Sequence, residues 1–158
     1  MSMRITDVVV NWLENEEWQE RPEVGEDEQA SSLGFSMAVS DDFAVKGYFE
    51  VSEKIGMFKL FMYFFDSKIP DTKIDEVVKW TNMVNISLGI GHLAVKLDDC
   101  VLRYYAAIDV EDAAFEPAHV ENIVNAGIGA MRSSLPQFMA ICFGGKTAEE
   151  ALKIEPDD

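Results

Sequence analysis

The chain has 158 residues, 48% of them hydrophobic and 27% charged, so we expect a single globular domain, residues 1–158, with a sizeable core. Acidic residues outnumber basic ones by 29 to 13, and the formal net charge is −16. This charge disfavours nucleic acid and anionic membrane surfaces as partners, and no apolar stretch approaches the ~18 uncharged residues that a membrane span requires.

The first predicted element is an amphipathic helix over about residues 3–18. Its apolar residues are spaced three and four apart, as one face of a helix requires. They are Ile5, Val8, Val9, Trp12 and Leu13. Residues 19–32 follow as an acidic connection without apolar periodicity. The acidic segment 14–28 matches no motif that we can name.

From Leu33 the apolar period changes to two, and three alternating runs are separated by Asp41-Asp42 and by a turn at Gly56. This pattern predicts an antiparallel meander of three strands. The third run, MFKLFMYFF from residue 57, is apolar on both faces. Such a run is typical of a central strand, or of a strand whose second face is covered.

Pro70 begins a second predicted helix, and two alternating runs at residues 90–97 and 100–110 then predict a hairpin. A long helix opens at Pro117 and a short one follows Thr147. Strands grouped in hairpins with helices between the groups predict an α+β fold. We expect a five-stranded antiparallel sheet with helices packed on one face, in the order α-βββ-α-ββ-α, and an α+β core over residues 33–153.

Few residues are candidates for catalysis or metal binding. His92 and His119 have no partner at ligand spacing, and Cys100 and Cys142 have no neighbouring base. Cys142 lies on the apolar face of its helix, which predicts a buried, inert thiol. We therefore predict no catalytic residue, no metal, no cofactor and no enzymatic activity. Two cysteines without a disulfide framework, and no signal peptide at the N-terminus, favour a cytoplasmic location.

The second face of the predicted sheet carries aromatic and cationic side chains. Tyr, Phe and Arg are enriched in the cores of protein interfaces, although aromatic cross-strand pairs are also common on an ordinary exposed face. The candidate partner surface consists of Tyr48, Phe61, Tyr63, Arg103 and Tyr105. Alternation assigns the opposite positions to the core, namely Phe35, Val45, Leu60 and Leu102.

Over roughly residues 33–153 the sequence resembles the YbjN family, small bacterial proteins described as sensory transduction regulators. Asn82 and Asn85 match two asparagines at the end of the family's middle helix, and Pro136, Gly145 and Ala151 match its late proline, glycine and short last helix. The resemblance implies a fold similar to type III secretion chaperones, a homodimer and a role through protein contacts. It implies no active site.

Two functions remain open on the sequence. The first is a non-enzymatic regulator or chaperone-like adaptor that acts through contacts with a protein partner. The second is a small-ligand sensor with a pocket between the sheet and the long helix, where Gly127 and Gly129 would leave room. We also expect a homodimer, because the apolar seam of the long helix offers more hydrophobic surface than one small sheet needs. This seam consists of Val124, Ile128, Met131, Leu135 and Phe138. Docking of the seam on its own sheet explains it equally well.

Overall fold

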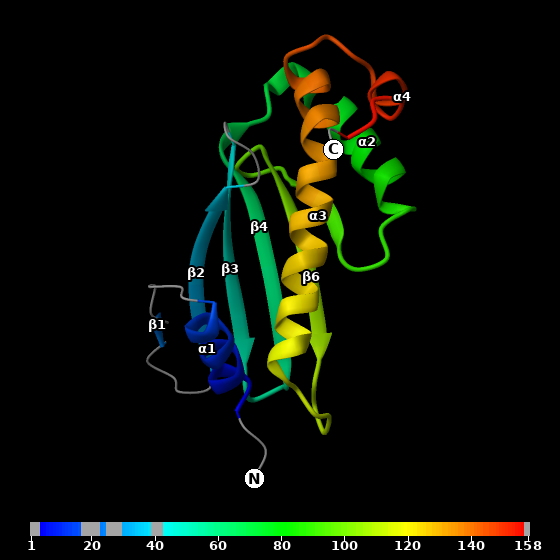
Figure 1. The fold of residues 1–158 in the computed structure, drawn as a ribbon. Coiled ribbons are helices and arrows are strands. Elements are labelled where there is room, and N and C mark those ends of the chain that lie inside the picture. The colour runs from blue at the N-terminus through cyan, green and yellow to red at the C-terminus, as the bar shows by residue number, and fades with distance from the viewer. Residues whose placement is uncertain (1–3, 17–22, 25–29, 39–42, 157–158) are drawn as a thin grey trace.

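The computed structural model describes residues 4–16, 23–24, 30–38 and 43–156 (Figure 1). The helices of this part of the chain are α1 (Ile5–Asn15), α2 (Ile74–Asn85), α3 (Pro117–Cys142) and α4 (Ala148–Ala151), and one 3-10 turn (Asp71–Lys73) leads into α2. The strands are β1 (Glu23–Val24), β2 (Ala30–Ala38), β3 (Ala44–Ser52), β4 (Met57–Lys68), β5 (His92–Lys96) and β6 (Val101–Asp109).

The strands form one antiparallel sheet in the order β1-β2-β3-β4-β6-β5. The predicted number of five strands was wrong, because β1 adds a sixth inside the segment that we expected to be an acidic connection. Glu23 pairs with Ser32 and Val24 with Ser31. A strand of two residues has no alternation that a sequence pattern could reveal.

Two boundaries differ from the sequence prediction. Helix α1 is shorter than the predicted helix over about residues 3–18, and β2 begins at Ala30 rather than at Leu33. Residues 1–3 and 17–22, at the two ends of the predicted helix, lie outside the described residues. So do residues 25–29 of the predicted connection.

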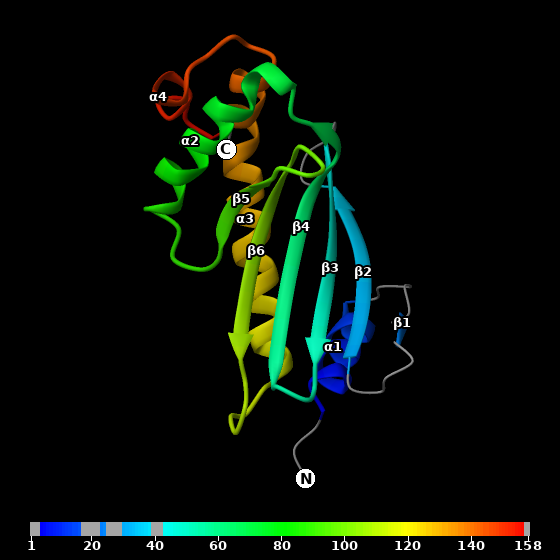
Figure 2. The same ribbon diagram turned by 180° about the vertical axis from the view of Figure 1, so that it is seen from behind.

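Helices α1 and α3 lie against the same face of the sheet (Figure 1), as predicted. Helix α2 packs beside the edge strand β5, and α4 packs on α2 and α3. In the view from behind, no helix of the described residues covers the broad surface of β2, β3, β4 and β6 (Figure 2). We call this surface the helix-free face.

The core lies between the sheet and the two helices that cover it. Val45, Leu60 and Leu102 are buried there as predicted, whereas the side chain of Phe35 lies outside the described residues. The apolar seam of α3 is consumed by this packing. Val124, Met131 and Phe138 are buried against the chain's own sheet, while Ile128 and Leu135 are partly buried at its margin. The seam therefore does not indicate a dimer.

Gly127 lets α3 approach the sheet closely. A Cβ atom at this position would lie 2.8 Å from Met62 Sδ and 2.9 Å from Tyr104 Cε1. The Tyr104 hydroxyl donates to the Ile90 carbonyl at 2.6 Å, which holds the ring against the helix. The space that we expected at Gly127 for a ligand is thus filled by Met62 and Tyr104. Gly129 faces outward, with nothing within 4 Å of its Cβ position.

Asn85 attaches the end of α2 to β5. Its side-chain amide donates to the Leu93 carbonyl at 2.8 Å, and its side-chain oxygen accepts from the Leu93 N–H at 2.8 Å. The Asn85 side chain therefore occupies the place of a neighbouring strand. Asn82, nearly one turn earlier, is exposed. Of the two asparagines in the YbjN-like motif, Asn85 is thus a structural residue.

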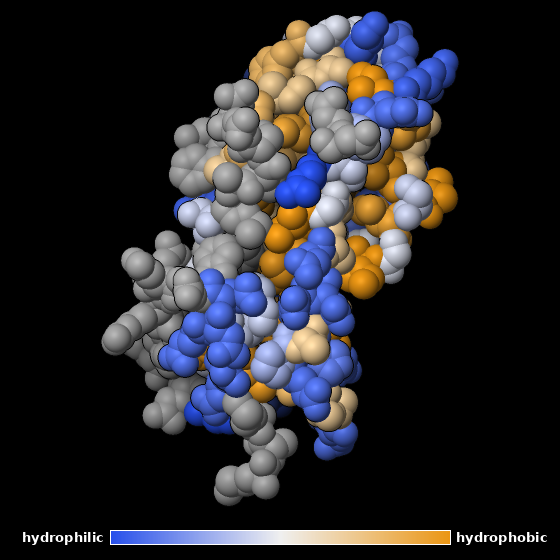
Figure 3. Space-filling model, in the orientation of Figure 1, coloured by the Kyte–Doolittle hydropathy of each residue, from blue (hydrophilic) through white to orange (hydrophobic). Residues whose placement is uncertain are grey.

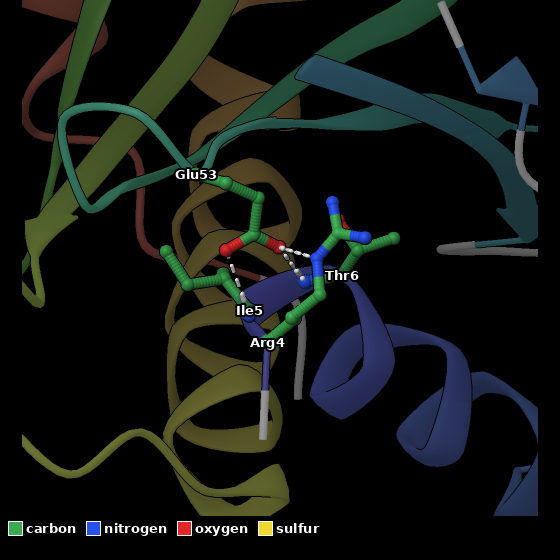
Figure 4. Close-up of polar contacts among 4 residues, drawn as sticks. All are labelled: Arg4, Ile5, Thr6 and Glu53. Carbon is green, nitrogen blue, oxygen red and sulfur yellow. Dashed lines mark hydrogen bonds and ion pairs between the residues drawn. The ribbon is translucent and has the colours of Figure 1, made fainter. Parts of the chain in front are cut away.

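Glu53, in the turn between β3 and β4, caps the N-terminus of α1 (Figure 4). Its carboxylate accepts hydrogen bonds from the Ile5 N–H at 3.2 Å and from the Thr6 N–H at 2.8 Å, and it lies 3.8 Å from Arg4 Nε. Arg4 occupies the N-cap position but its side chain makes no capping hydrogen bond. A residue 47 positions away in the sequence thus supplies the cap and anchors α1 on the sheet.

The close approach at Gly127 predicts opposite effects for two glycine substitutions in α3. Gly127→Ala should lower the free energy of unfolding by about 1–3 kcal/mol, because the added methyl group overpacks against the Tyr104 ring. Gly129→Ala is the matched control and should raise it by about 0.5–1 kcal/mol, because alanine is the better helix former. Urea denaturation of the two variants measures both values. Equal effects would contradict the described packing.

The cap predicts that Glu53→Ala weakens the docking of α1. We expect a loss of about 1–2 kcal/mol in the free energy of unfolding, because two backbone N–H groups lose their acceptor. Hydrogen exchange of the α1 amides should accelerate more than that of the α3 amides. Lys54→Ala, at the exposed neighbouring position, is the control. Unchanged protection of α1 in Glu53→Ala would show that the cap is unimportant.

Candidate functional site

The five residues of the candidate partner surface all lie on the helix-free face, in two adjacent rows across the strands. The first row places Tyr48 beside Phe61, Phe61 beside Tyr105, and Tyr105 beside His92. The second row places Lys46 beside Tyr63, Tyr63 beside Arg103, and Arg103 beside Ala94. We call these the aromatic row and the cationic row. Alternation along β3, β4 and β6 predicted this arrangement.

The rings of the aromatic row pack against one another. Tyr48 and Phe61 are stacked with centroids 4.7 Å apart, Phe61 and Tyr105 are 5.0 Å apart, and Tyr105 and His92 are 5.3 Å apart. Phe61 is only 7% exposed as a result. Our expectation that Phe61 offers its own surface to a partner therefore needs correction, because its neighbours cover it. Phe61 supports the rings beside it.

Arg103 connects the two rows. Its guanidinium carbon lies 5.4 Å from the centre of the Phe61 ring and 5.9 Å from that of Tyr105, distances at which a cation is attracted to an aromatic ring. Its Nε atom is buried and has no hydrogen-bond partner among the described residues. Sequence reasoning missed this feature, because it depends on how the neighbouring rings enclose the side chain.

Tyr48 and Tyr63 also interact, with their rings stacked 6.1 Å apart. Burial of the Tyr48 hydroxyl, together with its hydrogen bond to Tyr63, raises the pKa of Tyr48 far above its usual range. The hydroxyl therefore stays protonated at neutral pH. The Tyr48 hydroxyl is thus not an activated nucleophile.

The remaining candidate residues have structural roles. His119 Nδ1 accepts a hydrogen bond from the Glu116 N–H at 3.0 Å and completes the capping box of α3. Burial raises the pKa of the Cys142 thiol to about 11, so the thiol is protonated and unreactive at neutral pH. Cys100 is partly exposed. Across the described ranges, no group of three or more His, Cys, Asp or Glu side chains is placed to hold a metal ion.

A hollow of about 310 Å³ lies between α2 and the edge strand β5. Val78 and Leu97 are among its lining residues and are exposed, Leu97 by 63%. Ile86 and Ile90, in the connection from α2 to β5, are also exposed, and Figure 3 shows hydrophobic side chains gathered over this connection. We call Val78, Ile86, Ile90 and Leu97 the edge patch. Periodicity along the sequence does not reveal such a patch, because exposure at a sheet edge depends on strand order.

A second hollow, of about 860 Å³, lies at the N-terminal end of α1. It is bordered by the Glu53 cap and by the connection from β6 to α3, and the residues around it include Glu111, Asp112 and Glu116. A lining so rich in carboxylates differs from the mostly apolar pockets that hold small molecules. It also lies away from the place where we expected a ligand pocket.

The different burial of Phe61 and Tyr63 predicts that truncating these two residues of β4 lowers the free energy of unfolding by different amounts. Phe61→Ala should lower the free energy of unfolding by about 3 kcal/mol, because a buried ring is lost. Tyr63→Ala should cost about 1 kcal/mol or less, because its ring is partly exposed and only cross-strand contacts disappear. Urea denaturation distinguishes the two. A larger cost for Tyr63 than for Phe61 would contradict the described burial.

None of the helices described in the structure has the length and apolar composition needed to cross a membrane. No family model matches the sequence, and the comparison with curated proteins finds no relative. A chain in the solved structure of the HopA1–SchA chaperone–effector complex has a similar fold, with a TM-score of 0.51 and 12% sequence identity. The similarity covers 80% of the present chain and 89% of that chain. It supports the predicted α+β fold, an antiparallel sheet with helices, as an architecture shared with a chain of that complex.

Proposed function

We propose that this chain is a non-enzymatic, chaperone-like adaptor that binds a protein partner through its helix-free face. The observation that carries the proposal is the aromatic row beside the cationic row, on a surface that no described helix covers. The fold shared with a chain of a chaperone–effector complex supports the same class of function. The proposed contact residues are Tyr48, Tyr63, Arg103 and Tyr105, with Phe61 beneath them.

The physical state of these side chains favours binding. Binding costs less when side chains are already held in one conformation, because little rotational freedom is then lost. Ring contacts across β3, β4 and β6, stacked between Tyr48 and Phe61 and tilted between Phe61 and Tyr105, hold the aromatic row in this way. Tyrosine also brings a large contact area together with a polar hydroxyl group. The few residues of this patch can therefore supply most of the binding free energy of an interface.

We also place the chain with the YbjN-like regulators, as a proposal that rests on the motif residues. Asn85 joins α2 to β5, Pro136 lies within α3, and Gly145 has a φ of 67° after the end of α3. Asn85 and Gly145 thus have roles in building the fold, whereas Asn82 is exposed. We further propose that the protein acts in the cytoplasm and regulates its partner by holding it.

A homodimer forms the second part of the proposal, and the edge patch supports it better than the α3 seam does. Val78 and Leu97 expose apolar surface at the hollow between α2 and β5, and Ile86 and Ile90 expose theirs in the connection from α2 to β5. Apolar side chains left exposed in neighbouring elements are typical of association surfaces. The patch lies at the edge of the sheet, so a second copy bound there leaves the helix-free face open to a partner.

The proposed function predicts a specific pattern of partner loss. The tagged chain should retain a protein from its native host, identified by mass spectrometry, and Tyr63→Ala or Tyr105→Ala should weaken binding of the purified partner about fivefold or more. Glu121→Ala, on the exposed side of α3, is the matched control and should bind as the unmodified chain does. Partner binding that survives both tyrosine changes but is lost in the control would place the interface on the helix side.

The proposed dimer predicts a mass twice that of the monomer in size exclusion coupled to light scattering at micromolar concentration. Leu97→Asp should convert it to a monomer, because a carboxylate would be buried in an apolar contact. Ile55→Asp is the control, since Ile55 is similarly exposed but lies in the turn between β3 and β4. A monomer mass for the unmodified chain would end this part of the proposal.

A further inference from the structure

The helix-free face is locally cationic within a strongly acidic chain. Lys46, Lys59 and Arg103 lie on β3, β4 and β6 of this face, and Lys96 continues it on the edge strand β5. Lys59 pairs with Glu50 at 2.8 Å, and Lys96 pairs with Asp99. Lys46 and Arg103 make no ion pair within the described part of the chain, although the sequence holds 29 acidic residues.

Within the cationic row, Tyr63 lies between Lys46 and Arg103. Tyr63 is the cross-strand neighbour of Lys46 on β3 and of Arg103 on β6. Ala94, the cross-strand neighbour of Arg103 on β5, has only a methyl side chain. An anionic group placed above Tyr63 can therefore meet two long cationic side chains and the phenol hydroxyl together.

The Arg103 guanidinium is held ready for such a group. The rings of Phe61 and Tyr105 pack against it, and its Nε has no acceptor in the part of the chain that the structure describes. A buried donor without a partner calls for an explanation in a folded protein. Arginine presents several N–H groups in a planar arrangement that matches a carboxylate. The side chain is only partly buried, so its outer N–H groups remain within reach of a partner.

We propose that the cationic row is a subsite for an acidic side chain of the protein partner. This inference rests on the proposed function and specifies which kind of partner side chain binds at the cationic row. A partner segment lays apolar or aromatic side chains on the aromatic row and places an Asp or Glu carboxylate above Tyr63, between Lys46 and Arg103. Screening in physiological salt extends over about 8 Å, so the local cations outweigh the distant negative charge of the chain.

A nucleic acid fits this face less well than an acidic protein segment. Base stacking requires rings whose flat surfaces are open, whereas Tyr48 and Phe61 stack on each other with 17° between their planes. Several consecutive phosphates would also meet the net charge of −16 outside the cationic row. One carboxylate among apolar residues avoids this repulsion.

The test uses a library of random 12-residue peptides, selected on the intact chain, with affinities measured by fluorescence anisotropy. We expect the selected peptides to combine apolar residues with at least one Asp or Glu. Replacing that residue by Asn or Gln, or making Arg103→Met, should weaken binding about tenfold or more, and both changes together should add little further loss. Lys59→Met, whose cation already has a partner in Glu50, is the control and should leave the affinity unchanged.

Lys46→Met provides a second variant on the other side of Tyr63 and does not depend on the packing of Arg103. The selected peptides could bind Tyr63→Ala more weakly but bind Arg103→Met and Lys46→Met as tightly as the unmodified chain. This result would overturn the acidic subsite and leave the proposed function standing. Selected peptides that tolerate Tyr63→Ala and Tyr105→Ala, or a failure to select any peptide, would count against both. Binding of single-stranded RNA that depends on Arg103 would replace the acidic protein segment by a nucleic acid.

Discussion

The close approach of α3 to the sheet at Gly127 is the contact on which the architecture depends. Because residue 127 has no side chain, Met62 and Tyr104 can reach the helix backbone, and the apolar seam of α3 closes over β4 and β6. Glu53 then anchors α1 on the same face through the N-terminal amides of that helix. Both covering helices are thus committed to one side of the sheet. The opposite side is left with the strands' own outward-pointing residues, and its chemistry follows from which residues alternate with the core.

Much of this arrangement follows from periodicity. The period of two in β3, β4 and β6 placed Val45, Leu60 and Leu102 in the core and Tyr48, Tyr63 and Arg103 on the other face, because side chains in a strand alternate strictly. Periodicity does not reveal contacts that depend on tertiary position. The two-residue strand β1, the cap supplied by Glu53 and the filling of space at Gly127 all arise from segments distant in the sequence. Phe61 shows what periodicity can and cannot predict. Its face of the sheet was predicted correctly, whereas its burial by Tyr48 and Tyr105 was not.

The helix-free face differs in charge from the chain as a whole. With 29 acidic and 13 basic residues, most exposed surfaces are expected to repel anions and, by charge alone, to attract basic segments without selectivity. Our proposal gives a different preference to this face, which combines packed rings with two cations that make no ion pair in the described ranges. Such a contrast between a local surface and the whole molecule favours selectivity in partner choice, because a mismatched charge is penalised. The edge patch is apolar and lies elsewhere on the sheet, so self-association and partner binding would use separate surfaces.

We propose that the face left open by the helices holds the partner. Side-chain footprinting of the purified complex distinguishes this face from the helix side, by comparing the labelling of each residue with and without the partner. We expect partner binding to protect Tyr48, Tyr63, Tyr105 and His92, while Tyr104, buried on the other side of β6, is labelled weakly in both states. Protection confined to the outer surfaces of α1 and α3, with the four residues of the open face labelled as in the free chain, would contradict the account.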